Sequence, residues 1–216
     1  MTLEFIANVI GTLAAAFAGA FFAFKFDKNQ RKEEKVNNEV AAGNVALFAL
    51  SVIHNTLWQY QKEIVEKYRD KPDSWLNLEA SLSVEQENTS FNAEDLSFLL
   101  QSNAGTFQQV FLEGIRFRFA ARSIDRHTQV VLSEVFPRLS GAALRIGEKR
   151  PSDEIEKILG AGIVQQLKIL TAGIIKNVDE NVISSRDAFV KLRASLKIIH
   201  PNGTFIDLPP SAQNGG

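Results

Sequence analysis

The stretch FIANVIGTLAAAFAGAFFAF, residues 5–24, decides the fold that we expect for this chain. Its 20 residues carry no charge, and only Asn8 and Thr12 among them are polar. An α-helix rises about 1.5 Å per residue, so this run extends about 30 Å, the thickness of the hydrocarbon core of a bilayer. The stretch therefore predicts a single transmembrane helix, with residues 1–26 as a membrane anchor.

A buried core helix and a cleaved signal peptide are the alternative interpretations of this stretch, with Ala18-Gly19-Ala20 as the cleavage site of the latter. A core helix is disfavoured because a run of charged residues follows directly. A signal peptide is disfavoured because Glu4 precedes the run where such peptides carry basic residues. We therefore expect the span to stay in the chain.

The flanking charges predict the orientation of the span. No Lys or Arg precedes it, whereas five follow it closely: Lys25, Lys28, Arg31, Lys32 and Lys35. Basic residues remain on the cytoplasmic side of a membrane, so we expect the N-terminus outside the inner (plasma) membrane and the rest of the chain in the cytoplasm.

Small residues recur along one face of the span. They are spaced four apart, and the polar residues Asn8 and Thr12 lie beside them: Ala7, Gly11, Ala15, Gly19 and Ala23. Small side chains let two membrane helices approach closely, and polar ones can hydrogen-bond across the contact. Ala and Gly are also simply common in membrane spans. The spacing favours a membrane interface, so we expect the bilayer and a second copy or another membrane protein as partners.

The rest of the 216 residues predicts helices. Apolar residues spaced three and four apart from Val36 to Tyr68 indicate that the first helix continues beyond the membrane. Further helices are expected over about 92–100, 106–135, 152–159 and 164–199, with boundaries near Pro72, Pro137, Gly160 and Pro201. The predicted class is all-α, with a transmembrane helix that continues into an antiparallel four- or five-helix bundle over residues 27–200. Residues 201–216 are expected to form a flexible or lightly docked tail.

Two polar features of the first helix have plain interpretations. His54 lies on the apolar stripe, where a core residue that sets the helix register is favoured over a site residue. The charged segment 27–39 is interpreted as a solvated helix rather than a lipid-binding patch, because Glu33, Glu34 and Glu39 dilute its basic residues.

The composition excludes several kinds of chemistry. The chain has no cysteine, which excludes disulfides, thiol catalysis and Cys-ligated metal sites. Its net charge of −1 gives no positive field for nucleic acids, so we do not expect nucleic-acid binding. Nucleotide-binding and zinc-hydrolase motifs are missing, and the three histidines lie far apart in the sequence. We expect no metal, no cofactor and no catalytic residue.

One row of arginines is a candidate ligand site. Arg118, Arg122 and Arg126 are spaced four apart and share one side of the predicted third helix. Such a row could bind phosphate, a nucleotide or RNA. The alternative is a solvated face whose charges pair with acids such as Asp125 or Glu94.

Two resemblances accompany these observations. The run from Arg122 to His127 is similar to the R-x4-H motif of HEPN ribonucleases, although Ser123 departs from the Asn, Asp or His that often follows the Arg. This resemblance implies that Arg122 stabilises phosphate charge and that His127 acts as acid or base across a dimer. The second resemblance rests on the order of the anchor, the long helix, Trp75, residues 91–100 and the basic helix after them. This order resembles that of uncharacterised bacterial single-pass membrane proteins and implies architecture only. Separately, some small anchored helical proteins of bacteria serve as partners or membrane effectors in phage-defence loci.

The leading hypothesis is therefore a non-enzymatic, membrane-anchored interaction, scaffold or effector protein that self-associates through its span. A role in a bacterial defence or stress system, with static or regulated assembly, is compatible with it. The alternatives are a membrane-anchored ribonuclease built on Arg122 and His127, and a small-ligand sensor that uses the arginine row.

Overall fold

The structure is a computed structural model that describes residues 3–81, 84, 89–142 and 151–208, with side chains described from residue 16 onward. All regular secondary structure in these residues is helical, which confirms the predicted all-α class. The helices form five continuous segments, two of which contain a π-helical turn. Their bounds are Leu3–Tyr60 (α1) with the π-turn Gln61–Val65 and Glu66–Tyr68 (α2), Ser74–Asn77 (α3), Phe98–Val130 (α4) with the π-turn Val131–Val135 and Phe136–Gly141 (α5), Ser152–Leu159 (α6), and Ala161–Ile199 (α7).

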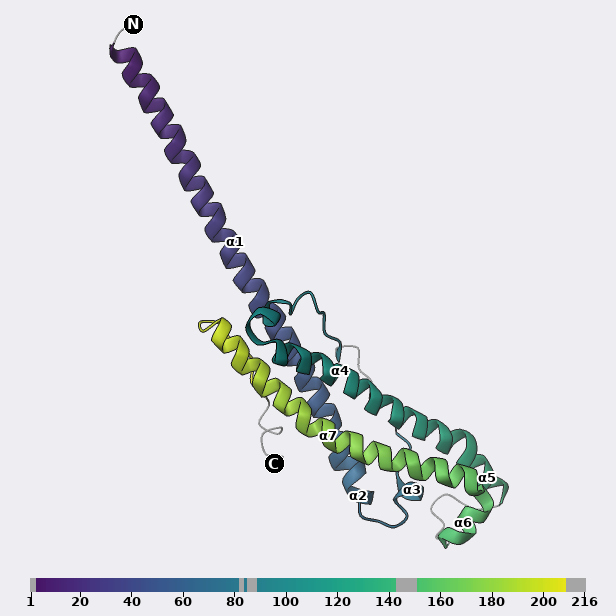
Figure 1. The fold of residues 1–216 in the computed structure, drawn as a ribbon. Helices are drawn as coiled ribbons and strands as arrows, with labels where there is room; N and C mark the ends of the chain where they lie inside the picture. The colour runs from purple at the N-terminus through teal and green to yellow at the C-terminus, as the bar shows by residue number, and fades with distance from the viewer. Residues whose placement is uncertain (1–2, 82–83, 85–88, 143–150, 209–216) are drawn as a thin grey trace.

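Three long helices make the body of the protein (Figure 1). α7 packs along both α1 and α4 and runs antiparallel to them, whereas α1 and α4 contact one another little. Buried side chains fill the body in three successive clusters, with Leu50 and Leu192 near the exit of α1, Leu57 and Phe117 in the middle, and Leu159 at the far end. The body is thus a three-helix arrangement with two short helices added.

Gly43 brings α1 and α7 together. A Cβ built on Gly43 would lie 2.7 Å from Cδ2 of Leu196, closer than side-chain carbons come in proteins. About three helical turns further along α1, the Nδ1–H of the buried His54 donates to the carbonyl of Val182 at 3.0 Å. This bond confirms His54 as a core residue that fixes the register of α1 against α7.

Two breaks in helix geometry show where sequence rules hold and where they fail. Asn103 has non-helical φ −155° and ψ 78° inside α4, and its Oδ1 accepts from the Thr106 N–H at 3.1 Å. The gap expected between the predicted helices 92–100 and 106–135 is therefore a kink within α4, which begins only at Phe98. The expected end before Pro137 is wrong, because the helix continues to Gly141. The π-turn before Pro137 widens the backbone where the proline ring would otherwise clash with the preceding turn.

The first eight residues of the expected tail are docked on the body. The side-chain amide of Asn44 donates to the carbonyl of Thr204 at 3.0 Å and accepts from the Ile206 N–H at 3.1 Å. Phe205 and Leu208 are buried in the cluster that contains Leu50. Apolar side chains and a paired backbone therefore hold residues 201–208, and residues 209–216 of the expected tail lie outside the described residues.

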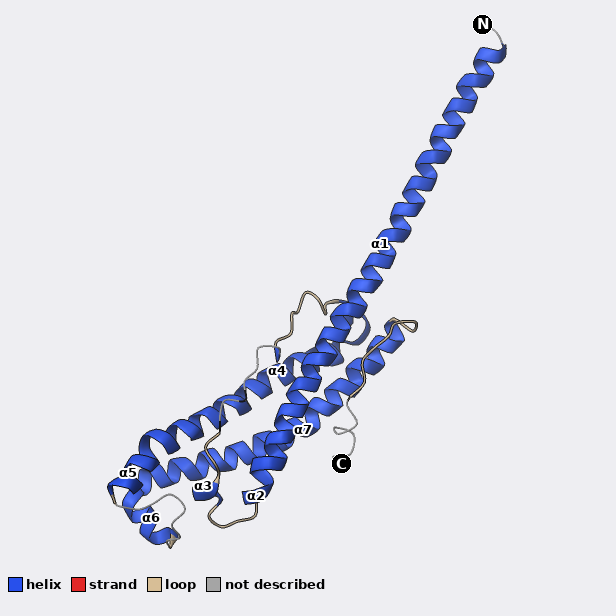
Figure 2. Ribbon diagram, turned by 180° about the vertical axis from the view of Figure 1, so that it is seen from behind, coloured by secondary structure: helices blue, strands red, loops and turns tan. Residues whose placement is uncertain are grey.

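α1 extends far beyond the body (Figure 2). Every described side chain from Ala16 to Asn38 is exposed, and the first half-buried residue of α1 is Glu39. About 36 residues of a continuous helix, counted from Leu3, thus protrude by about 54 Å at 1.5 Å per residue.

Candidate functional site: a protruding apolar helix on a charged stalk

The outer part of α1, residues 3–24, includes the described stretch 16–24, whose side chains are all apolar and exposed. The phenylalanines of this stretch and the one that follows it are between 62% and 74% exposed: Phe17, Phe21, Phe22, Phe24 and Phe26. Exposed apolar surface of this extent marks a membrane or protein contact. The described side chains of residues 16–24 carry no polar group on any face, and a helix that is apolar all round is typical of a membrane span.

The helix that contains this segment satisfies the length and composition of a membrane span. From Ala16 to Tyr68 it includes an 18-residue window of mean hydropathy 1.5. Half of that window is buried, so it lies in the part of α1 inside the body and not among residues 16–38, which are all exposed. Core helices and signal sequences satisfy the same criterion. The full exposure of residues 16–38 is therefore the observation that separates the outer part of α1 from an ordinary core helix.

The predicted small-residue face lies on this outer part. Ala7, Asn8, Gly11, Thr12 and Ala15 belong to α1, and their side chains lie outside the described residues. The two other members of the face are described: Ala23 is exposed, and a Cβ added at Gly19 would meet no atom within 4 Å. No contact among the described residues therefore requires a glycine at position 19.

A charged stalk, residues 25–38, connects the outer part of α1 to the body. Asp27 and Arg31 form an ion pair at 2.9 Å, and the side-chain amide of Gln30 donates to Glu34 at 3.0 Å. Pairs spaced four residues apart stabilise a helix in water by a few tenths of a kcal/mol each. These pairs support the helical form of a stalk whose side chains are all exposed.

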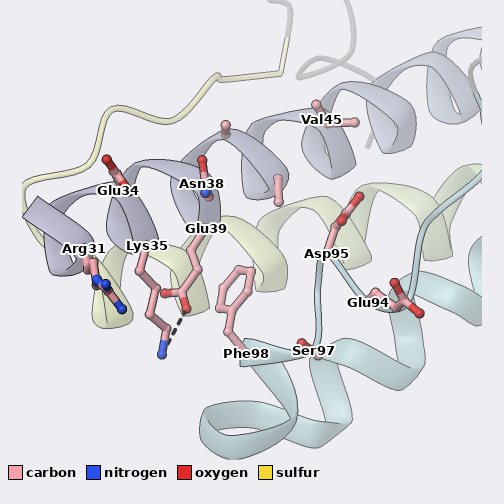
Figure 3. A pocket seen from close by; sticks show the side chains of 12 residues that line it. Arg31, Glu34, Lys35, Asn38, Glu39, Val45, Glu94, Asp95, Ser97 and Phe98 are labelled. Atoms are coloured by element: carbon pink, nitrogen blue, oxygen red, sulfur yellow. Dashed lines mark ion pairs between the residues drawn. The ribbon is translucent and has the colours of Figure 1, made fainter.

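An open pocket of 690 Å³ lies where the stalk enters the body (Figure 3). Lys35 and Glu39 of α1 lie on one side, and Phe98 projects toward them from the start of α4. Oε1 of Glu39 pairs with Lys35, and Oε2 lies 3.0 Å from Nε2 of His200. The ring centroid of His200 lies 6.0 Å from that of Phe98. The end of α7 therefore lies next to the base of the stalk.

The arginine row is on the surface of α4. Arg118, Arg122 and Arg126 are all exposed, and no ion pair joins them to an acid within the part of the chain that the structure describes. Glu94, one of the acids expected to pair with them, lies instead at the pocket beside the stalk. The row is thus open to solvent, and the pairing with acids that the alternative interpretation expected is not seen in the described residues.

His127 does not share the surface of the arginine row. Its side chain is 1% exposed, and burial lowers its pKa to about 4. Arg122 precedes it by five residues, which corresponds to about 140° around a helix. One copy of the chain therefore does not bring the Arg122 guanidinium and the His127 imidazole together, and the imidazole is neutral at pH 7.

One polar cluster between α4 and α7 is not predicted from the sequence. The carboxylate of Glu113 is 1% exposed and accepts from Arg116 at 2.8 Å and from the Ser184 hydroxyl at 2.7 Å. Asn181 donates to the carbonyl of Arg116 at 3.3 Å beside an open pocket of 520 Å³. An acid among apolar neighbours on the buried face of a helix is the signal that could have indicated it.

The described residues form no metal-binding site. No group of three or more His, Asp or Glu side chains there is placed to hold an ion. The site that the geometry singles out is therefore the protruding part of α1 together with its stalk. No protein-family model matches the chain, and no curated protein or solved structure is significantly similar to it.

Proposed function

We propose that the protein is a single-pass membrane protein that acts as a scaffold or interaction module. In this proposal residues 5–24 cross the inner membrane, the N-terminus is outside, and the helical body is held in the cytoplasm by the stalk. The observation that supports it is the continuous exposure of α1 from Ala16 to Asn38, which includes four phenylalanines of the apolar stretch.

The exposed phenylalanines of this stretch are in an unfavourable position if water surrounds them. Burial of one Phe side chain away from water is favourable by about 1.5–3 kcal/mol. The body offers no groove to them, because α1 leaves it at Glu39, some 15 residues further along. A bilayer covers all faces of a helix at once, whereas a protein partner would cover one face and leave the remainder in water.

Association of copies is the second part of the proposal. The small-residue face would allow two anchors to approach closely, and Gly19 has no role in packing within the chain. Because α1 is continuous from Leu3 to Tyr60, paired anchors would hold two bodies at a defined separation. A scaffold needs such a defined separation of its bodies, and this role does not require catalysis.

Insertion is tested by charge substitution. Phe17→Lys with Phe21→Lys places two charges in the span at a cost of about 2.5–3.5 kcal/mol each near the middle of a bilayer. The variant should leave the membrane fraction on alkaline extraction, whereas the wild type remains. Val45→Lys with Phe48→Lys is the matched control, since both residues are exposed on α1 within the body. If all three proteins stay in the membrane, insertion of residues 5–24 is wrong.

Association is tested separately by crosslinking in membranes. Gly11→Leu, Ala15→Leu and Gly19→Leu together should reduce crosslinked oligomers, because larger side chains separate the helices. The control changes apolar residues on another face, Val9→Leu with Leu13→Ile. Equal crosslinking of wild type and the triple variant would rule out the small-residue interface while leaving insertion in place.

A further inference from the structure

Four lysines form a stripe along the stalk. Lys25, Lys28, Lys32 and Lys35 are spaced three, four and three residues apart on one continuous helix, and all four are exposed. At about 100° per residue they lie within an arc of roughly 80°. Lys25, Lys28 and Lys32 form no ion pair within the described residues, and Lys35 lies 3.8 Å from Glu39. We call these four residues the lysine stripe.

The acids of the stalk lie on its other side. Asp27, Glu33 and Glu34 are each about 120° or more from the centre of the lysine stripe, by the same helical rotation. Asp27 is paired with Arg31, and Glu34 with Gln30. The sequence suggested that acidic residues dilute the basic ones along the stalk. Around the helix, however, the acidic and the basic side chains lie on different faces.

The lysine stripe lies on the same side of α1 as the body. Lys25 and Lys32 precede Glu39, Ala46 and Ile53 at intervals of seven residues, and these three residues face into the bundle. The end of α7 lies beside α1 on that side, close to where α1 leaves the body (Figure 1). The stripe therefore borders the corner between the end of the anchor and the nearer end of the body.

The position of the stripe along α1 matches the region of lipid headgroups. Lys25 directly follows Phe24, the last residue of the uncharged stretch, and Lys35 lies about 15 Å further on. The headgroup region extends about 5–8 Å beyond the hydrocarbon, and the potential of an anionic surface reaches about 8–10 Å further. Lys25 and Lys28 reach headgroups directly, and a tilt of α1 toward the stripe brings Lys32 and Lys35 closer.

We propose, resting on the anchor proposed above, that the lysine stripe binds anionic lipid headgroups on the side of the membrane that faces the body. Lysine suits this role because its charge is carried by a flexible apolar stem, which can lie along the edge of the hydrocarbon. Since the stripe and the body lie on the same side of α1, headgroup binding tilts the body toward the bilayer. An acidic protein segment is disfavoured as the occupant because the stripe begins where the anchor ends.

The experiment uses the full-length protein in two kinds of vesicle, phosphatidylcholine alone and phosphatidylcholine with phosphatidylglycerol. The chain has no cysteine, so Asn202→Cys, on the exposed turn after α7, gives a single labelling site. A fluorophore there is quenched by lipids that carry a nitroxide on the headgroup. Quenching should be roughly threefold or more greater with phosphatidylglycerol, given the surface attraction of several lysines. Equal quenching in both vesicles overturns the proposal.

Three variants show whether the stripe itself is responsible. Replacement of its four lysines by Gln should abolish the difference between the two lipids. A second variant exchanges faces without changing net charge and should abolish it too: Lys28→Glu, Lys32→Glu, Glu33→Lys and Glu34→Lys. A matched control removes four exposed lysines elsewhere and should keep it: Lys62→Gln, Lys67→Gln, Lys71→Gln and Lys176→Gln. A difference that persists in the four-lysine or the face-exchange variant contradicts the proposal.

Flotation of the same samples separates this proposal from the anchor. Wild type and all variants should float with vesicles of phosphatidylcholine alone, since the apolar stretch is unchanged. A wild-type protein that floats with neither vesicle contradicts the anchor. A protein that floats with both vesicles and shows equal quenching contradicts only the headgroup site.

Discussion

Gly43 and Leu196 set the separation of α1 and α7: a Cβ at position 43 would lie 2.7 Å from Cδ2 of Leu196. Leu196 is fully buried, so its side chain can make room only by shifting against its neighbours in the core. Gly43→Ala should therefore lower the free energy of unfolding by about 1–3 kcal/mol, the usual cost of overpacking, despite the better helix propensity of Ala.

Thermal unfolding of the full-length protein in detergent micelles, followed by the helical circular dichroism signal, measures this effect. Gly173→Ala is the control, because Gly173 lies in the middle of α7 and a Cβ there meets no atom within 4 Å. That control should gain about 0.5–1 kcal/mol. If both variants are equally stable, the close approach at Gly43 is not a constraint on the fold.

Asn44 holds the C-terminal segment through two hydrogen bonds to Thr204 and Ile206. Asn44→Ala removes both, at about 0.5–1.5 kcal/mol each, and should loosen the docking of Phe205. Hydrogen exchange of the Ile206 amide should become about tenfold faster or more, because its acceptor is lost. Asn37→Ala, on the exposed stalk, should leave this amide unchanged. Equal exchange in wild type and Asn44→Ala would show that the segment is held by other contacts.

His127 makes the stability of the body depend on pH. Burial lowers its pKa from 6.5 to about 4, so the folded protein holds the neutral imidazole. As the pH falls below about 6.5 the unfolded chain binds the proton first, and stability is lost until about pH 4, by at most about 3 kcal/mol in total. His127→Leu should lack this part of the pH dependence. The wild-type imidazole, observed by NMR, should not titrate above pH 5; a titration near 6.5 would contradict the burial.

The sequence was sufficient to predict the long helices. The three- and four-residue spacing of apolar residues predicted one helix that reaches Tyr68, which α1, the π-turn Gln61–Val65 and α2 form together. Gly160 and Pro201 correctly marked the limits of helices. These signals are local, since periodicity and strong breakers act within one or two turns. Pro137 was misjudged because the π-turn Val131–Val135, which ends two residues before it, compensates for it, and propensity rules do not include that backbone form.

The parts that sequence reasoning missed depend on contacts between distant residues. Asn44 and Ile206 are 162 residues apart, so no local pattern indicates that the C-terminal segment docks. The burial of His127 follows from how α4 faces the other elements rather than from its neighbours in sequence. The sorting of stalk charges was within reach, because helical rotation alone separates Lys28 and Lys32 from Glu33 and Glu34 once one continuous helix is assumed.

The placement of the span and its orientation is the central claim, and single-cysteine labelling tests it most directly. The chain has no cysteine of its own, so Thr2→Cys and Asn202→Cys each create one labelling site. In intact cells a maleimide that cannot cross membranes should label only Thr2→Cys, and Asn202→Cys should react only after the inner membrane is permeabilised. Labelling of Asn202→Cys in intact cells, or recovery of the labelled protein in the soluble fraction, would contradict the account.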